Sequence, residues 1–145
     1  MTDPFNLKRF VDAQDPVLQS VRSELQRGSK QGHWIWFIFP QLKGLGSSST
    51  ATYYGIASRA EAEAFVKHPV LGPRLLECTQ LVTSVEGRSI EAILGGIDAM
   101  KFRSSMTLFR TVSPDQEVFA RALQKYFDGE PDPLTVKLLG AAQVG

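Results

Sequence analysis

Apolar residues recur at helical spacing along most of the chain, and the runs follow residues that can cap a helix. Asp-Pro or Ser-Pro dipeptides stand at positions 3–4, 15–16, 113–114 and 132–133, and each places an N-cap residue before a proline suited to a first helical turn. After Asp15-Pro16, apolar residues at positions 18, 21 and 25 share one face, and Gly28 can end the helix in a left-handed conformation. These dipeptides predict four helix starts.

Helical periodicity also extends over much of the remaining sequence. Five more segments show helical signals: each is bounded by capping or stop residues or repeats apolar side chains on one face. They are segments 58–68, 73–85, 89–94, 98–109 and 113–127. No pair of alternating apolar and polar runs is joined by a two-residue turn, so the pattern gives little support to a sheet. We therefore predict an all-α fold, a compact single domain over residues 1–145 with about six to eight short helices.

The run Trp34 to Phe39, WIWFIF, departs from this pattern because its composition suits a buried strand. An isolated strand would lack a partner among helices, so we interpret the run as a buried helical turn that leads into Pro40. In a helix, residues two apart lie about 200° around the axis. We expect one of Trp34 and Trp36 to pack inward and the other to border a cleft.

Composition narrows the classes of protein. The 145 residues are 43% hydrophobic, with 16 basic and 15 acidic residues and a net charge of +1, and they contain no long run of like charges. Binding to nucleic acid or to an anionic membrane is therefore disfavoured. The single Cys78 cannot form an intramolecular disulfide, and the N-terminal segment lacks the apolar core of a signal peptide. We expect a cytoplasmic protein without metal or cofactor, and the composition leaves the oligomeric state open.

Candidate chemistry concentrates in the stretch from His33 to Thr50. His33 can act as an acid or a base, because an imidazole titrates near cellular pH, and Trp34 and Trp36 can stack on a planar ligand. The following loop can bring backbone amides and a hydroxyl close to an anion through Gln41, Gly44, Gly46 and Ser47. The loop lacks the ending of a P-loop, so an ordinary mobile loop is the alternative, as burial in the core is for a tryptophan.

A second group of polar residues lies between Gly95 and Thr107. Asp98 and Lys101 are candidates for acid/base chemistry and charge stabilisation, and Arg103 can neutralise a phosphate or a carboxylate. Ser104 and Ser105 add hydroxyl groups to the same helix. Cations in the N-terminal half of a helix oppose its macrodipole, so helix stability does not explain them, although a solvated face or salt bridges would.

Four ordered motifs resemble a bacterial and fungal family catalogued as domain of unknown function 1810. They are FVDAQ at 10–14, HWIWFIFPQLKGLGSSS at 33–49, HPVLGPRL at 68–75 and KFRSSMTLF at 101–109. The resemblance spans nearly the whole chain and implies an intracellular, multihelical, single-domain protein, but it implies no activity. The positions that match the family pattern are Gln14, His33, Trp34, Trp36, Pro40, Gln41, Gly44, Gly46, Ser47, His68, Gly72, Arg74, Asp98, Lys101, Ser104 and Ser105.

Three functional hypotheses follow. The leading one is a pocket for a small anionic ligand, such as a nucleotide-like compound, between the 33–49 stretch and the 98–105 helix. The second is a hydrolase for glycosidic or phosphoester bonds, such as those of ADP-ribose derivatives. Lys101-Phe102 resembles a feature of YbiA-like ADP-ribose-processing proteins, although their glutamate motif has no clear counterpart here. The third is a module that binds a protein partner through exposed aromatic residues.

Overall fold

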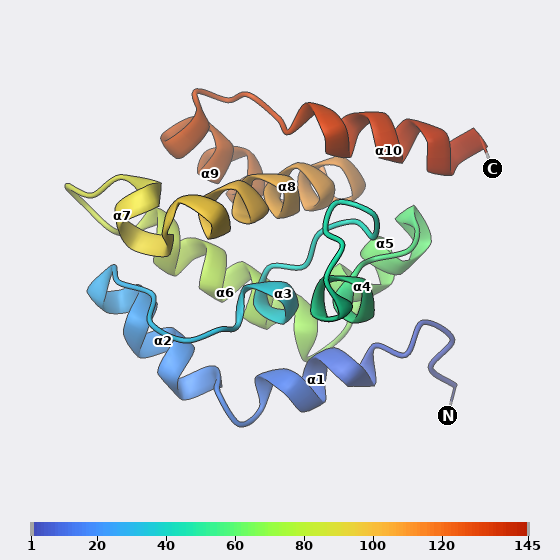
Figure 1. Cartoon of the computed structure of the whole chain (residues 1–145), viewed down its shortest axis with the longest axis horizontal. Coiled ribbons are helices and arrows are strands. Elements are labelled where there is room, and N and C mark those ends of the chain that lie inside the picture. Colours follow the sequence, from blue (N-terminus) through green and yellow to red (C-terminus); the bar gives the residue numbers. More distant parts are fainter. Residues whose placement is uncertain (1, 145) are drawn as a thin grey trace.

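A computed structural model describes the backbone of residues 2–144 and the side chains of residues 2–140 (Figure 1). Ten helices occur within this part of the chain, so the all-α prediction is confirmed, but the predicted number of six to eight is too low. Their bounds are α1 Lys8–Gln14, α2 Leu18–Arg27, α3 Ile35–Ile38, α4 Ser49–Tyr54, α5 Arg59–Lys67, α6 Leu71–Thr83, α7 Ile90–Leu94, α8 Gly96–Val112, α9 Glu117–Phe127 and α10 Pro133–Val144.

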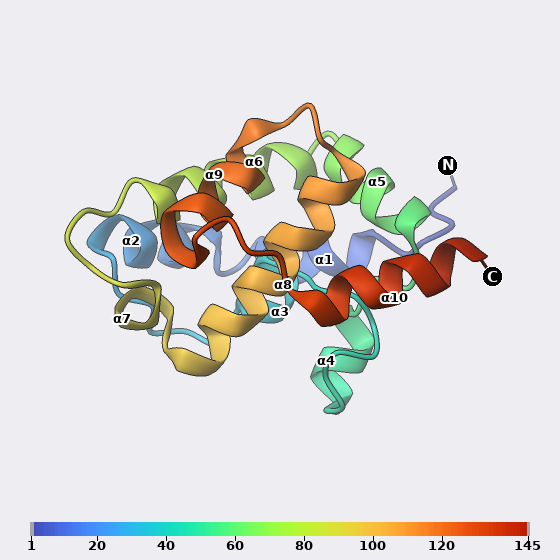
Figure 2. The same ribbon diagram turned by 90° about the horizontal axis from the view of Figure 1, so that it is seen from above.

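Helix α8 is the centre of the fold and contacts α3, α5, α7, α9 and α10. In the view from above, it crosses the middle of the molecule between α9 and α10 (Figure 2). Helix α6 lies beneath it and packs on α2, α3, α5 and α9. Within residues 2–144, the β pairing consists of one isolated parallel bridge, between Leu42 and Ile56. This bridge joins the two ends of the loop segment that contains α4.

The core contains a chain of phenylalanine rings that links the N-terminal half to α8 and α9. Phe10 meets Phe65 edge to face at 5.0 Å between ring centroids, and Phe65, Phe109 and Phe119 follow at successive centroid distances of 5.4 and 5.8 Å. Phe39, just after α3, contacts Phe102 of α8, with 4.9 Å between the ring centroids. These rings are fully buried, and the helical period of residues 98–109 predicts this burial for Phe102 and Phe109.

Local capping signals identify several helices correctly. Gly28 ends α2 in the left-handed conformation, with φ of 69°. The side-chain oxygens of Ser58 and Ser89 accept hydrogen bonds from the amides of Glu61 and Ala92, and thereby cap α5 and α7. Residues 35–38 form the predicted helical turn, so WIWFIF is not a strand.

The starts of α9 and α4 are among those that differ from the prediction. Ser113 does not cap α9, since its hydroxyl lies 3.2 Å from the carboxylate of Asp115 and Gln116 occupies the N-cap position. The Gly/Ser-rich segment predicted as a loop contains the start of α4, where Ser48 accepts a hydrogen bond from Ala51.

No helix within residues 2–144 has both the length and the apolar character needed to cross a bilayer.

Candidate functional site

A surface cleft of about 280 Å³ lies where the loop after α3, the first turns of α8 and the start of α10 meet; we call it the Lys101 cleft. Three segments that are far apart in sequence therefore form one concave surface. The cleft is lined by Gln41, Leu45, Gly46, Ile97, Met100, Lys101, Arg103, Ser104, Asp132 and Leu134. Five of these are residues that we singled out in the sequence, namely Gln41, Gly46, Lys101, Arg103 and Ser104.

The ammonium group of Lys101 has the fewest protein partners among the charged groups of the cleft. It lies over the ring of Trp36, with Nζ 4.8 Å from the centroid, and 3.9 Å from Oδ1 of Asp98. Asp98 is engaged more closely by Lys30, whose Nζ lies 2.7 Å from Oδ2. Because a cation over an indole keeps its hydrogen-bond donors, Lys101 can bind an anion from the cleft.

Arg103 and Ser104 have structural partners on the segment that leads into α10. Arg103 donates from Nε to the carbonyl of Glu130 at 3.0 Å and from Nη2 to the carbonyl of Pro131 at 3.1 Å. Ser104 donates to Oδ2 of Asp132 at 3.0 Å. These bonds use donors of Arg103 but leave its charge, since a carbonyl carries no full charge.

Asp132 also lines the cleft, although its place in the sequence predicts only a helix cap. Its Oδ2 accepts hydrogen bonds from the amide of Thr135 at 3.1 Å and from the Thr135 hydroxyl, and so caps α10. The Asp132-Pro133 dipeptide predicts this cap correctly. Its place beside Lys101 depends on the packing of α10 against α8, which no local pattern reveals.

The apolar residues of the cleft were also not among the site residues predicted from the sequence. Ile97, Met100 and Leu134 are exposed over 75%, 71% and 50% of their surfaces, and they stand around the charged groups together with Leu45. Ile97 and Met100 are three residues apart on α8 and face away from the core. Their position outside the Phe102 stripe is the signal in the sequence that could have identified them.

The two tryptophans lie in different environments. Trp34 is buried, with 2% of its surface exposed, and its Nε1 donates to Oε1 of Glu24 at 3.0 Å. Trp36 is half-buried, and the ammonium group of Lys101 packs over its ring. Trp36 Nε1 and Ser105 Oγ are buried atoms without a hydrogen-bond partner among the described residues.

The other predicted residues lie outside the lining of the cleft. His33 is exposed at the start of the aromatic run, and Gly44 and Ser47 are exposed in the following loop. Ser105 is fully buried against the core. Residues 2–140 contain no group of three His, Cys, Asp or Glu side chains arranged to hold a metal ion. The structure therefore does not bring His33 together with Lys101 in the cleft.

Glu24 is a buried carboxylate that fixes the segment before Trp34. Its Oε1 also accepts hydrogen bonds from the amides of Gln31 at 2.6 Å and Gly32 at 2.9 Å. Burial raises the pKa of Glu24. The hydrogen bonds from Gly32, Gln31 and Trp34, together with the charge of Lys30, outweigh this effect, so the pKa lies below its ordinary value of 4.5. The carboxylate is therefore ionised at neutral pH.

This arrangement predicts a pH-dependent contribution to stability. Because the pKa of Glu24 is lower in the folded chain, its contribution to the free energy of unfolding is fully present above about pH 4.5 and is lost as the pH falls through the folded value. Urea unfolding at pH 7 and pH 3 should show a smaller pH dependence in Glu24→Gln than in the wild type. The exposed Glu117→Gln is the control, and an equal dependence in all three proteins would contradict the prediction.

Several residues of the family pattern hold helices together. Gln14 donates from Nε2 to the carbonyl of Phe37 at 2.7 Å, and its Oε1 accepts from Arg74 at 3.3 Å. Arg74 also pairs with Asp15 at 2.8 Å. His68 accepts hydrogen bonds at Nδ1 from the first amides around the start of α6. These contacts give Gln14, Arg74 and His68 structural roles away from the Lys101 cleft.

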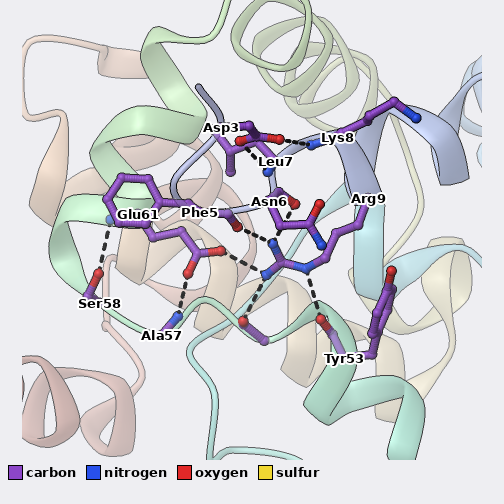
Figure 3. Close-up of polar contacts among 11 residues, drawn as sticks. Asp3, Phe5, Asn6, Leu7, Lys8, Arg9, Tyr53, Ala57, Ser58 and Glu61 are labelled. Atoms are coloured by element: carbon purple, nitrogen blue, oxygen red, sulfur yellow. Dashed lines mark hydrogen bonds and ion pairs between the residues drawn. The ribbon is translucent and has the colours of Figure 1, made fainter. Parts of the chain in front are cut away.

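Larger hollows flank the N-terminal segment, and Arg9 lines one of them. Figure 3 shows its guanidinium group enclosed by backbone carbonyls and by the Glu61 carboxylate. Nη2 lies 2.8 Å from Oε2 of Glu61, Nε donates to the carbonyl of Tyr53 at 2.9 Å, and Nη1 donates to the carbonyls of Phe5 and Asn6. With its donors bonded inside the protein, Arg9 joins α1 to α4 and α5 and offers little to a ligand.

Comparison with known proteins agrees with the resemblance found in the sequence. The model of a family described as protein of unknown function (DUF1810) matches residues 4–139. The crystal structure of the conserved hypothetical protein Rv1873 from Mycobacterium tuberculosis is similar, with a TM-score of 0.94 and 56% sequence identity over 95% of this chain and 99% of that chain. A comparison with curated protein sequences gives no significant match.

Proposed function

The chain belongs to this family of proteins of unknown function, and since membership supplies no reaction, we propose a function from the Lys101 cleft: binding of a small anionic ligand. The observation that carries the proposal is the position of Lys101. Its ammonium lines the cleft and rests on Trp36, while the neighbouring Asp98 carboxylate is held by Lys30. A bound anion would supply the close negative partner that Lys101 lacks.

Gln41 and Gly46, on the loop after α3, also line the cleft. The side-chain amide of Gln41 forms no hydrogen bond with other described residues, so its donors and acceptor are available to a ligand. Gly46 contributes to the lining, and the loop needs glycine there because an added Cβ would approach the Cβ of Ala51 to 2.7 Å. A nucleotide-like compound is one form of ligand, with its planar part against the apolar wall and its anion at Lys101.

A ligand screen with a charge-removing variant tests the proposal. We expect an anion from a panel of nucleotides, ADP-ribose, sugar phosphates and carboxylates to raise the melting temperature, because a ligand at about 100 times its Kd adds roughly 2.7 kcal/mol to stability. Lys101→Gln should weaken binding at least about tenfold, which corresponds to about 1.4 kcal/mol. Lys67→Gln, at an exposed lysine in the last turn of α5, should leave the affinity unchanged.

Two results would contradict the proposal. One is the absence of a thermal shift with every anion of the panel. The other is equal binding by wild type and Lys101→Gln, which would place the ligand elsewhere on the surface. The unfolding curve of each variant in the absence of ligand is the control for folding.

The geometry supports binding more than hydrolysis. A hydrolase for glycosidic or phosphoester bonds would need an acid or a base beside the ligand, and His33 and Asp98 do not line the cleft. Asp132 is the carboxylate that does, and its Oδ2 serves as a helix cap. Turnover by the wild type that is lost in His33→Ala or Asp98→Ala, with folding intact, would favour the enzymatic alternative.

The exposed side chains of Ile97, Met100 and Leu134 support the protein-partner alternative, because exposed apolar groups around a concave surface are common at interfaces. A partner would be expected to cover all three side chains and the polar rim.

We also propose a cytoplasmic location for the protein, which is compatible with the buried thiol of Cys78. Burial raises the pKa of this thiol to about 12, so it is not reactive at neutral pH.

A further inference from the structure

The charged side chains that line the Lys101 cleft do not suit a ligand with several negative charges. Lys101 and Arg103 carry two positive charges, and Asp132 carries one negative charge on the same surface. Oδ1 of Asp132 forms no hydrogen bond with other described residues, so its charge is compensated at Oδ2 alone. The lining therefore complements one negative charge, and Asp132 would repel the additional charge of a polyphosphate.

The donors that can reach an anion are also few. Two of the three guanidinium nitrogens of Arg103 donate to the backbone carbonyls of residues 130 and 131. These bonds use the N–H of Nε and one N–H of Nη2, so a phosphate could be bound by Arg103 only through the N–H groups of Nη1 and the remaining N–H of Nη2. The ammonium of Lys101 forms no hydrogen bond with other described residues, so all its donors are available, and it binds an anion as a point charge.

Most of the remaining lining is apolar. Leu45, Ile97, Met100 and Leu134 surround the charged groups, and the last three are at least half exposed. Their exposed surface stays in contact with water unless a ligand with an apolar body covers it. The volume of about 280 Å³ equals about nine molecules of liquid water at ~30 Å³ each, which is room for about ten non-hydrogen atoms.

We infer that the Lys101 cleft binds a monoanion with an apolar body, of the class of medium-length aliphatic or aryl carboxylates. The carboxylate lies at Lys101, and the body lies against Ile97, Met100 and Leu134. This inference rests on the proposed function, because it names the ligand class of the same site. It differs from a nucleotide-like ligand in charge and in the polarity of the body.

Calorimetric titration of the full chain tests the inference with matched probes. Octanoate, with about ten non-hydrogen atoms in total, has both the charge and an apolar chain; octanamide has the chain without the charge, and acetate has the charge without the chain. We expect octanoate to bind at least tenfold more tightly than octanamide and acetate, and more tightly than pyrophosphate or ADP-ribose. In Lys101→Gln, the difference between octanoate and octanamide should disappear.

Two further variants separate the contributions of the apolar lining and of the Asp132 charge to binding. Met100→Ser should weaken octanoate binding several-fold without affecting the fold, because 71% of the Met100 surface is exposed. Asp132→Asn removes a charge but keeps an acceptor oxygen for the helix cap, so it should strengthen pyrophosphate binding relative to octanoate binding. Lys67→Gln is again the control for general attraction to anions.

The results distinguish the inference from the function on which it rests. Tighter binding of pyrophosphate or ADP-ribose than of octanoate, with loss in Lys101→Gln, would overturn the monoanion but support the anion site. Equal affinity for octanoate and octanamide would overturn the role of the charge. No binding of any probe would overturn both the inference and the proposed function.

Discussion

Replacing Arg9 by methionine is expected to destabilise the protein by about 3–5 kcal/mol, as when one partner of a buried ion pair is removed. The Arg9 and Glu61 side chains are only 8% and 5% exposed, so the carboxylate would remain buried without its cation. The carbonyls of Phe5, Asn6 and Tyr53 would also lose their donor. Urea unfolding followed by circular dichroism measures the loss.

The adjacent residue provides a matched control. Lys8 forms an ion pair with Asp12 at 2.9 Å, but the two side chains are 75% and 59% exposed. Because exposed pairs contribute little, Lys8→Met should leave the unfolding midpoint almost unchanged. Similar losses in Lys8→Met and Arg9→Met would show that the change to methionine in α1, rather than the buried pair, sets the stability.

Replacing Gly72 by alanine is expected to cost about 3 kcal/mol, at the upper end of the range for overpacking in a well-packed interior. A Cβ atom at this position would overlap the backbone carbonyl oxygen of Val66, and backbone cannot rotate away as a flexible side chain can. The first turn of α6 would have to move from the end of α5. Thermal or urea unfolding of Gly72→Ala measures the effect.

Gly140→Ala is the control for this substitution. Gly140 lies in α10, and a Cβ atom there would meet nothing within 4 Å. Since alanine has a higher helix propensity than glycine, the variant should be equally stable or more stable by up to about 1 kcal/mol. Unchanged stability in Gly72→Ala would show that α5 and α6 can separate without cost.

The predicted parts of the fold are those with local causes. Ser58, Ser89 and Gly28 act on backbone groups within a few residues, so their effect is visible in the sequence. Asp15 has the same local signal, but its carboxylate forms an ion pair with Arg74, 59 positions later, and gives α2 no side-chain cap. A tertiary contact of this kind competes with the local one, and the local pattern does not reveal it.

The candidate site divides in the same way. Unusual composition identified the loop at Gln41 and Gly46 and the helix at Lys101, which the fold brings to one cleft. Sequence spacing could not show that His33 is exposed outside the lining of this cleft. It also could not place Asp132 there, because α10 reaches the site only by packing along α8. The catalytic roles of His33, Asp98 and Lys101 stay predictions.

The contribution of α10 to the cleft also has a consequence during synthesis. Residues 41–46 and 97–104 emerge from the ribosome before Asp132 and Leu134, which form the remaining wall. A nascent chain that ends before Asp132 contains all the phenylalanines of the core but lacks one side of the cleft. The complete cleft therefore forms only after α10 has been synthesised and has docked on α8.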